Sequence, residues 1–580
     1  MSRQPARRRY ATWSVWLLIV SWLLTACGPA ATPATSVAKP TEPAAAPIEP
    51  AKPSAPPPTT ASAEPVVLKL GWLGKPDTLN PAYAFLTESY IMFDLILSPL
   101  VTEGIDGKYT GDLASEWSSS PDGLLWTFKL RDNLKWHDGT PLTAEDVVWS
   151  INAVIQNPDG WAALSGYVGG FKEATAPDAK TVQIALDQPI GNMEYRVSFL
   201  YALPRKDFES FKTPEDLQNF ANDAALGSGA FKLKTFDKDQ GVIVMDANPD
   251  YHLGRPKIDQ AIFRTFDNED AMVQAIKAGD IDAMIEVPST AAETVKGFAN
   301  VKLVQQPSRA LSQLIINSAP ADHDPKPTRS PALEDPVVKL AIAHAINKQD
   351  LVDIVLQGLG KPGYSIIPPT LGGGFWHNPA IQDVPFDLKT ANDLLEKAGY
   401  VKGPDNIRAK DGVRLDFRLQ FPSDSDTAPR VADLMAGWFK EAGIKVTPQA
   451  VDPDALTAAC CPAGDYDLML WGWGSDPDPD FMLSVLTSDQ FVEGGWSDSG
   501  YTNPKYDELY KAQQSATDPA ARQKIVWEMQ QMVFEDKPYI VYWYADTLQA
   551  YRTDRFKNFI ESPILALESA ASLRQVEPVK

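Results

Sequence analysis

The chain has 580 residues, with 53 basic against 75 acidic side chains and a formal net charge of −22. At about 100–200 residues per domain, this length predicts several domains with buried cores. The 44% of hydrophobic and 22% of charged residues are typical of a globular protein. The acidic excess argues against nucleic-acid binding, because phosphate backbones are bound by clustered lysine and arginine.

The first segment in the chain is typical of an export signal. A basic start with arginines at positions 3 and 7–9 precedes the apolar stretch 13–24. That stretch is shorter than the roughly 20 apolar residues that a membrane-spanning helix needs. It ends in Leu-Thr-Ala-Cys, which resembles a bacterial lipobox. We therefore predict a lipoprotein signal peptide at 1–27 with lipid on Cys27; a chance cysteine near an ordinary cleavage site is the alternative. The basic cluster does not decide between the Sec and twin-arginine routes.

The next segment, residues 28–65, is nearly all proline, alanine, threonine and serine. It is almost without the aromatic and branched apolar side chains whose burial offsets the entropy of ordering a chain. We predict a disordered, semi-rigid tether. Beyond Cys27 the chain holds only the adjacent pair Cys460 and Cys461. These two residues form either a vicinal disulfide or two free thiols, and their spacing is not that of a metal site.

After residue 66, predicted strands alternate with predicted helices. Strands are expected where β-branched or alternating apolar residues occur, at 66–72, 126–130 and 181–186. Helices are expected to begin at side chains that cap a helix N-terminus, namely Thr143, Asn268, Asp335, Asp387 and Asp518. The mixed pattern predicts an α/β architecture with more than one domain.

Four blocks in this part of the chain carry a more specific pattern. They are residues 111–150 with LRDNLKWHDG, 227–282 with NPDYHLGRPKID and AMVQAIKAGDID, 335–369 with AIAHAINKQDLVDIVLQGLG, and 466–480 with YDLMLWGWGSDPDPD. In their order and spacing over residues 66–545, these blocks resemble the oligopeptide, dipeptide and nickel-binding family (family 5) of extracellular solute-binding proteins of ABC importers.

The resemblance implies a two-lobed α/β fold like the periplasmic binding proteins of type II, with an inserted subdomain and a hinge of two strands. Mapped by the four blocks, lobe I is expected at 66–97, 226–316 and 540–580, its inserted subdomain at 98–225, and lobe II at 317–539. The expected hinge strands include residues 314–317 and 539–543.

The resemblance also points to a ligand-binding residue. In peptide binders of this family, an aspartate after a Gly-Trp turn receives the α-ammonium group of the ligand. Gly472, Trp473 and Asp476 match that motif, so Asp476 is the first candidate. The alternative is that Asp476 only caps a turn in an acidic loop.

A calcium site in the run Asp476, Asp478 and Asp480 is a weaker reading of the same loop. An EF-hand loop needs glycine at its sixth position and glutamate at its twelfth. Those positions are Phe481 and Thr487 here.

Aromatic residues near Asp476 are candidate walls of the ligand site, because they supply apolar area with a polar handle. They are Trp471, Trp473, Trp496 and Tyr501. The alternative for each of these residues is that its side chain packs in the core and does not contact a ligand. On resemblance alone, Asn80 and Tyr83 in the loop after the first strand also face the ligand.

One segment departs from the family pattern. Short-peptide binders carry an arginine after a strand of lobe II, and it clamps the ligand carboxylate. The matching residues 420–427 hold Asp424 and Asp426 and no arginine. This departure weakens strict dipeptide specificity and suits a longer peptide held by its backbone, a different cation, or a sugar-like solute.

The remaining motifs favour a binding protein over an enzyme. The five histidines are scattered with no pair at i,i+4, so the sequence predicts no metal or other cofactor. It contains no nucleophile elbow, HExxH or P-loop motif. We expect a monomeric, lipid-anchored receptor on the outer face of the cell membrane. Its expected partners are a peptide or small solute and the permease and ATPase of an ABC importer, with no nucleic acid. A surface hydrolase of peptides or glycans and a binding protein that serves a sensor are the alternatives.

Overall fold

The computed structural model describes residues 64–211 and 213–579. The predicted signal peptide, Cys27 and all but the last two residues of the predicted tether lie outside the described residues. Within the described ranges, no helix combines the length and the apolar character needed to span a bilayer.

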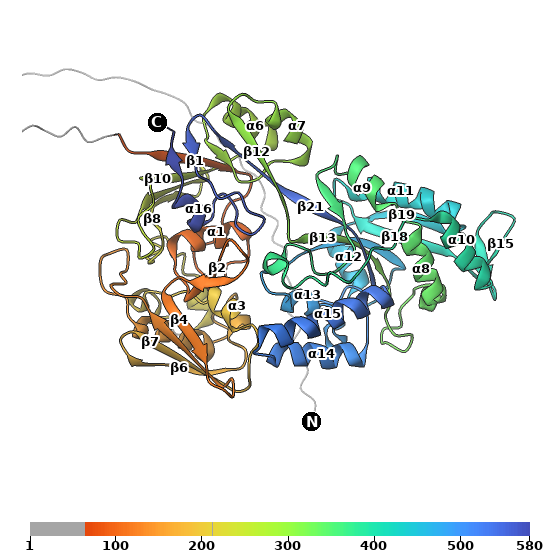
Figure 1. Cartoon of the computed structure of the whole chain (residues 1–580), viewed down its shortest axis with the longest axis horizontal. Helices are drawn as coiled ribbons and strands as arrows, with labels where there is room; N and C mark the ends of the chain where they lie inside the picture. Colours follow the sequence, from red (N-terminus) through yellow and green to blue (C-terminus); the bar gives the residue numbers. More distant parts are fainter. Residues whose placement is uncertain (1–63, 212, 580) are drawn as a thin grey trace, which may run out of the picture. The chain divides into compact units, whose positions relative to one another are not determined.

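A mixed sheet of twelve strands organises the described chain (Figure 1). Ten strands follow the order β19-β18-β20-β13-β21-β11-β1-β10-β9-β8, and β12 and β14 pair with β21. One half of the sheet contains β1 (Val67–Trp72), β8 (Phe231–Asp237), β9 (Val242–Ala247), β10 (Gln260–Thr265), β11 (Ala283–Met284) and β12 (Val301–Pro307). The other half contains β13 (Ala310–Ile316), β14 (Gly360–Pro362), β18 (Asp416–Pro422), β19 (Lys445–Val451) and β20 (Leu468–Gly474).

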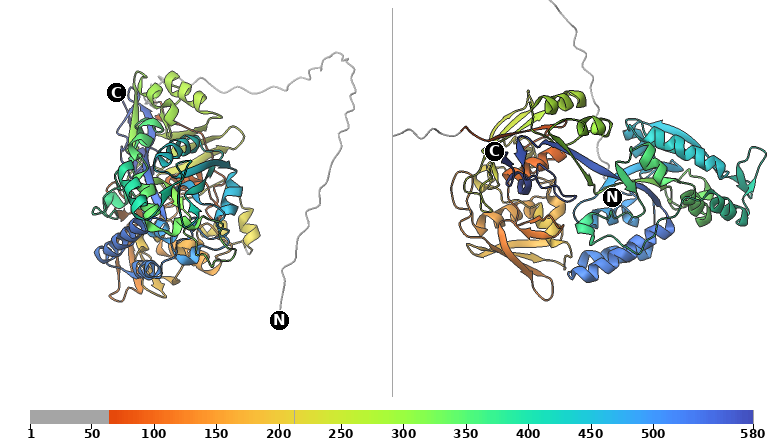
Figure 2. Two further views of the ribbon diagram at one scale, coloured as in Figure 1. Left: turned by 90° about the vertical axis from the view of Figure 1, so that its right-hand side faces the viewer. Right: turned by 45° about the horizontal axis from the view of Figure 1, so that its top comes forward.

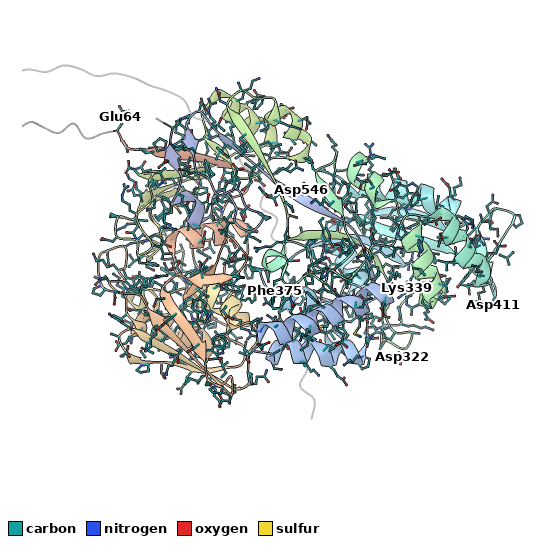
Figure 3. The ribbon with its side chains drawn as sticks, in the orientation of Figure 1. Glu64, Asp322, Lys339, Phe375, Asp411 and Asp546 are labelled. Atoms are coloured by element: carbon teal, nitrogen blue, oxygen red, sulfur yellow. A yellow bond between two sulfur atoms is a disulfide. The ribbon has the colours of Figure 1, made fainter. Side chains whose placement is uncertain are left out.

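Two chain segments connect these halves. Strand β21 (Tyr539–Arg552) pairs with β13 and β14 up to Ala545, and with β12 from Asp546 onward (Asp546 is labelled in Figure 3). Strands β12 and β13 are consecutive and are separated only by Ser308 and Arg309. The predicted hinge residues 314–317 lie at the end of β13, and the predicted hinge residues 539–543 form the start of β21. Both stretches pair with strands of the second half. The predicted lobe boundaries stay a prediction, and the pairing favours a change of lobe near 308–309 and 545.

Helices cover both faces of the second half of the sheet. One apolar core joins it to α8 (Pro336–His344), α10 (Leu388–Lys397) and α11 (Ala428–Glu441). A second core joins the opposite face to α12 (Pro453–Cys460), α13 (Asp480–Ser484), α14 (Pro504–Ser515) and α15 (Pro519–Asp536), the last two running side by side (Figure 2). Coverage on both faces explains why β13 and β20 contain near-continuous apolar runs.

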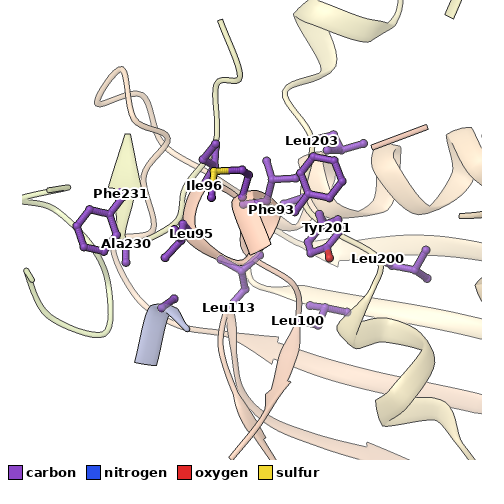
Figure 4. Close-up of a cluster of buried hydrophobic side chains, with 14 of the residues drawn as sticks. Phe93, Leu95, Ile96, Leu100, Leu113, Leu200, Tyr201, Leu203, Ala230 and Phe231 are labelled. Atoms are coloured by element: carbon purple, nitrogen blue, oxygen red, sulfur yellow. The ribbon is translucent and has the colours of Figure 1, made fainter. Parts of the chain in front are cut away.

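The segment 98–225 forms an antiparallel sheet of its own, in the order β4-β5-β7-β6. Its elements are β2 (Val101–Glu103), β3 (Tyr109–Gly111), β4 (Ala114–Ser119), β5 (Leu125–Leu130), α2 (Ala144–Gln156), η1 (Ser165–Val168), β6 (Phe171–Asp178), β7 (Thr181–Leu186), α3 (Met193–Ser198), α4 (Arg205–Phe208) and α5 (Pro214–Gln218). We call this segment the insert. It shares a buried core with α1 (Thr87–Ile96), where Phe93 meets Tyr201 at 5.9 Å between ring centroids (Figure 4).

Shorter elements complete the chain. They are α6 (Glu269–Ala278), η2 (Ser289–Ala291), α7 (Ala292–Lys296), η3 (Pro331–Glu334), α9 (Lys348–Ile354), η4 (Leu371–Gly374), β15 (Val401–Lys402), β16 (Arg408–Lys410), β17 (Val413–Arg414), η5 (Ser488–Gln490), β22 (Phe556–Lys557), α16 (Ala570–Leu573) and β23 (Glu577–Pro578).

The local predictions of strands and helix starts are confirmed. The three predicted strands are β1, β5 and β7. The side chains of Asn268, Asp335, Asp387 and Asp518 each accept a hydrogen bond from a backbone N–H of the helix that follows. At α2, the backbone N–H of Thr143 donates to Asp146 in a capping box.

Candidate functional site

Asp476 lies in the loop after β20, at a point where lobe-II elements meet the insert. Its Oδ2 accepts a hydrogen bond of 2.6 Å from the hydroxyl of Tyr195 on α3. Burial raises the pKa of the Asp476 carboxyl, and the bond from Tyr195 opposes that rise. The neighbouring charge of Asp478 raises the pKa further. Asp476 is therefore a carboxylate whose charge is poorly solvated, which favours the arrival of a cationic group.

The partner of this carboxylate, Tyr195, belongs to a cluster of four aromatic rings from α1 and the insert. Tyr167 stacks on Phe199 at 4.8 Å between centroids, and Tyr195 meets Phe199 edge-on at 5.5 Å. Tyr90 approaches the same Phe199 ring at 6.3 Å. Burial, and after it the charge of Asp476, raises the pKa of the Tyr167 hydroxyl. Sequence reasoning missed all four residues, because they lie in segments with no motif that links them to Asp476.

Arg309 ties the site to the connection between the two halves of the sheet. Its guanidinium donates to Oε1 of Glu103 on β2 at 2.6 Å, and both side chains are largely buried. The carbonyl of Arg309 accepts a hydrogen bond of 3.2 Å from the backbone N–H of Ser475. The turn between β12 and β13, the insert and the Asp476 loop are thus in direct contact.

Glycines make two further contacts between the insert and the second half. The backbone N–H of Gly191 donates to the carbonyl of Gln514 at 2.7 Å. A methyl group on Gly191 would lie 2.4 Å from the carbonyl oxygen of Ala516, and one on Gly107 would lie 2.3 Å from the nitrogen of Gly373. Only glycine allows backbones to approach this closely.

Most of the predicted wall residues line one cavity of about 430 Å³ in the second half. Trp471, Gly472, Trp473 and Trp496 all contribute to it. Cys460 and Cys461 line the same cavity and are joined by a disulfide, one of the two states that the sequence allowed.

A second cavity, of about 300 Å³, shares Trp471 and Gly472 with the first. It is also lined by Asp424, Ser425 and Thr427, from the segment where short-peptide binders carry an arginine. The structure therefore presents an acidic rather than a basic side chain at this position.

Tyr501 lies away from the cavity that the three predicted tryptophan walls share, so its role as a wall stays a prediction that the structure does not support. Its side chain is buried in the core of the second half, where its ring packs edge-on against Tyr506. Its hydroxyl donates to Oδ2 of Asp536 at 2.5 Å. The sequence places Tyr501 near Asp476, but its side chain is directed at the α14–α15 pair.

Asn80 and Tyr83 anchor their own loop to the insert. The side-chain amide of Asn80, which is 1% exposed, donates to the carbonyls of Leu217 at 2.7 Å and Phe220 at 3.0 Å. The hydroxyl of Tyr83 lies within hydrogen-bonding distance of the carbonyls of Asp159, at 3.1 Å, and Pro214, at 3.2 Å, and can donate to one of them at a time. These bonds give both side chains a structural role in holding the loop, and their role in ligand binding stays a prediction.

The other aspartates of the acidic loop are already engaged. Arg522 donates to both oxygens of Asp478 at 2.5 and 2.6 Å, and the two side chains are 2% and 4% exposed. Asp480 accepts a bond of 2.6 Å from Gln513. Among residues 64–211 and 213–579, no group of three or more His, Cys, Asp or Glu side chains could hold a metal ion. The calcium interpretation therefore has no support here.

Residues 108–493 match the model of the bacterial extracellular solute-binding proteins, family 5. The chain belongs to this family. Its relatives include the oligopeptide-binding protein AppA of Bacillus subtilis, which is 27% identical over 498 residues, covering 83% of this chain and 87% of AppA. They also include the di/tripeptide-binding protein 4 of Pseudomonas aeruginosa, which is 28% identical over 495 residues, covering 81% and 86%.

Solved structures of family 5 proteins share the fold. CtaP of Listeria monocytogenes superposes with a TM-score of 0.76 at 22% identity, covering 89% of this chain and 99% of CtaP. NikZ of Campylobacter jejuni, solved with Ni(L-His), gives 0.70 at 23% identity, covering 88% and 99%. The predicted two-lobed α/β fold is thereby confirmed, and we call the β1-containing half lobe I and the β20-containing half lobe II.

The buried ion pair of Arg522 and Asp478, in the loop that carries Asp476, leads to a prediction on stability. Replacing Arg522 by alanine leaves Asp478 buried without its counter-charge, so we expect the free energy of unfolding to fall by about 3–5 kcal/mol. Denaturant unfolding followed by circular dichroism measures this change. Lys389→Ala, which breaks the exposed pair with Asp393, is the control and should have no measurable effect. Equal losses in the two variants would contradict the prediction.

Asp498 leads to a prediction on pH dependence. Burial raises the pKa of its carboxyl to about 7, although Trp473 and Tyr539 donate hydrogen bonds to it. The unfolded chain has the ordinary value of 3.8, so between about pH 4 and 7 the native state holds a proton that the unfolded state has lost. This carboxyl therefore lowers stability as the pH rises through that window.

Asp498→Asn removes this titration. We take the free energy of unfolding of the variant minus that of the original protein. We expect this difference to be roughly 1–4 kcal/mol more favourable to the variant at pH 7.5 than at pH 4.5. Urea unfolding at the two pH values measures the change. The control Asp433→Asn, on an exposed face of α11, should show no such shift. A relative stability that is constant with pH would refute the assignment.

Proposed function

We propose that this family 5 protein captures a peptide, or a related amine-bearing solute, between its two lobes and delivers it to the permease of an ABC importer. A lipid on Cys27 would hold it at the outer face of the cell membrane, with residues 28–65 as the tether. The names of the relatives support a peptide ligand, since one is an oligopeptide-binding protein and another a di/tripeptide-binding protein.

The observation that carries this proposal is the half-buried carboxylate of Asp476, which lobe II presents to α3 of the insert. A buried carboxylate with a raised pKa is stabilised by a cation more than by a neutral hydroxyl. The α-ammonium group of a peptide is such a cation. Tyr90, Tyr167 and Tyr195 add aromatic faces that suit a cationic group.

The two connecting segments suggest how capture works. A solute that contacts both lobes stabilises the closed arrangement by its higher affinity for that state. The chain changes its pairing partners at two places, the turn at Ser308 and Arg309 and the middle of β21. We expect the backbone to bend at these two places when the lobes close. The permease and its ATPase then recognise the closed, loaded form of a monomeric receptor.

The second cavity bears on the choice of ligand. Asp424 in its lining cannot clamp a carboxylate as an arginine would. The site therefore suits a peptide long enough to be held by its backbone, or one with a basic group. We propose binding without chemical change of the ligand. Recovery of an intact co-purified ligand by native mass spectrometry supports this, and its hydrolysis by the purified protein would refute it.

Asp476 can be tested with free and N-acetylated pools of random tetrapeptides. Native mass spectrometry selects the best binder, and calorimetry measures its affinity. We expect Asp476→Asn to weaken binding of the free peptide by about 2–5 kcal/mol, because a buried charge pair loses one partner. The acetylated peptide should bind both forms weakly and alike, and Asp433→Asn is the matched control. An unchanged affinity in Asp476→Asn would remove this residue from the site.

Closure of the lobes can be tested at Gly191. An added methyl group meets the carbonyl of Ala516 at 2.4 Å, so Gly191→Ala should oppose closure. In small-angle scattering, we expect the best-binding tetrapeptide to reduce the radius of gyration of the original protein clearly, and that of the variant less. Gly166→Ala, where an added methyl group meets nothing within 4 Å, is the control. Equal compaction in all three proteins would contradict the closure mechanism.

A further inference from the structure

The cavity of about 430 Å³ in lobe II has an unusual floor. The Cys460–Cys461 disulfide ends α12 and lies in the lining beside Leu456 and Met469. A disulfide between neighbouring residues offers two sulfur atoms that are neither strong donors nor strong acceptors. Sulfur is also polarisable and makes favourable contacts with aromatic rings. The floor is therefore suited to an apolar or aromatic group.

The walls of this cavity are aromatic and held in place. Trp473 and Trp496 both meet the ring of Phe481 edge-on, at 5.7 and 5.8 Å between centroids. Trp496 is 55% exposed, so much of its ring is left open to solvent. A large exposed ring beside an apolar cavity is typical of a binding surface.

Three polar side chains in the lining, Trp473, Asp498 and Thr457, are already hydrogen-bonded within the protein. The indole N–H of Trp473 donates to Oδ2 of Asp498 at 2.9 Å, and the hydroxyl of Tyr539 donates to the other oxygen. The hydroxyl of Thr457 donates to the carbonyl of Pro453 at 2.9 Å. A polar occupant would compete with these bonds, whereas an apolar occupant leaves them intact.

The position of the cavity relates it to Asp476. Trp473 precedes Asp476 by three residues, which span at most about 11 Å of extended chain. A solute whose amine is held at Asp476 therefore brings its nearby side chains within reach of the cavity. The volume lies near the lower end of the roughly 300–1,000 Å³ range of small-molecule sites, which suits one large side chain rather than a whole peptide.

From this geometry we propose that the cavity over the Cys460–Cys461 disulfide is a subsite for one aromatic or bulky apolar side chain of the bound solute. The proposal rests on the proposed peptide-binding function and specifies its substrate class. The disulfide acts as the rigid floor of the subsite, and Trp473 and Trp496 act as its walls.

The test compares tetra-alanine with four tetrapeptides in which tryptophan replaces each alanine in turn. Calorimetry on the purified protein measures all five affinities. We expect the best tryptophan peptide to bind at least tenfold more tightly than tetra-alanine. Trp496→Ala and the double variant Cys460→Ala/Cys461→Ala should bring this ratio close to one. Trp438→Ala, a half-buried tryptophan on α11 outside the cavity, should keep the ratio.

Reduction supplies an independent readout that needs no substitution. A dithiol such as dithiothreitol gives two electrons and two protons to the S–S bond, forms two thiols and becomes a cyclic disulfide itself. We expect the tryptophan preference to fall on reduction and to return when oxidised glutathione takes the electrons and protons back. An unchanged preference in the reduced protein would remove the disulfide from the subsite.

The outcomes separate the two proposals. If tetra-alanine binding depends on Asp476 but no tryptophan peptide is preferred, the subsite is refuted and the proposed function stands. A preference that survives in Trp496→Ala and in the double variant also refutes the subsite. If none of the five peptides binds, the proposed function fails and the subsite fails with it.

Discussion

The partial burial of one carboxylate, Asp476, between two parts of the chain is the constraint on which the proposed site depends. Removing Asp476 from water costs free energy that a single hydrogen bond from Tyr195 only partly returns, which is why its pKa stays raised. A neutral hydroxyl is a weaker partner for a carboxylate than an ammonium group is. The protein therefore keeps at this position an electrostatic cost that a cationic ligand can relieve.

The neighbouring acids Asp478 and Asp498 differ from Asp476 in how their charge is accommodated. Asp478 is neutralised by the two parallel bonds from Arg522, a guanidinium held within the same core. Asp498 has its pKa raised to about 7, so burial brings its neutral form into the physiological range. One is paired with a cation and the other is readily protonated. Asp476 is more exposed than either, and the hydrogen bond to its Oδ2 comes from Tyr195 of the insert, which is why we propose it as the group that meets a ligand.

Features that depend on neighbouring residues, such as helix caps, could be predicted from the sequence. Contacts between residues far apart in the sequence could not. Helix caps such as Asn268 and Asp387 act over three residues, so their pattern is readable. Asp476 could be proposed because its motif is contiguous. Its partner Tyr195 is 281 positions away, in a segment with no distinguishing pattern. Tyr501 shows the converse limit, because closeness in sequence to Asp476 did not reveal that its side chain packs in the core against Tyr506.

In the mechanism that we propose, the contacts of Arg309 would couple ligand binding at Asp476 to movement of the lobes. The turn that carries Arg309 joins β12 of lobe I to β13 of lobe II. Its carbonyl accepts from the N–H of Ser475, the residue before Asp476, while its guanidinium pairs with Glu103 of the insert. Any rotation of the lobes about this turn must move these groups or break these bonds. The coupling is therefore a direct contact between hinge and site, and it needs no chain of intermediate residues.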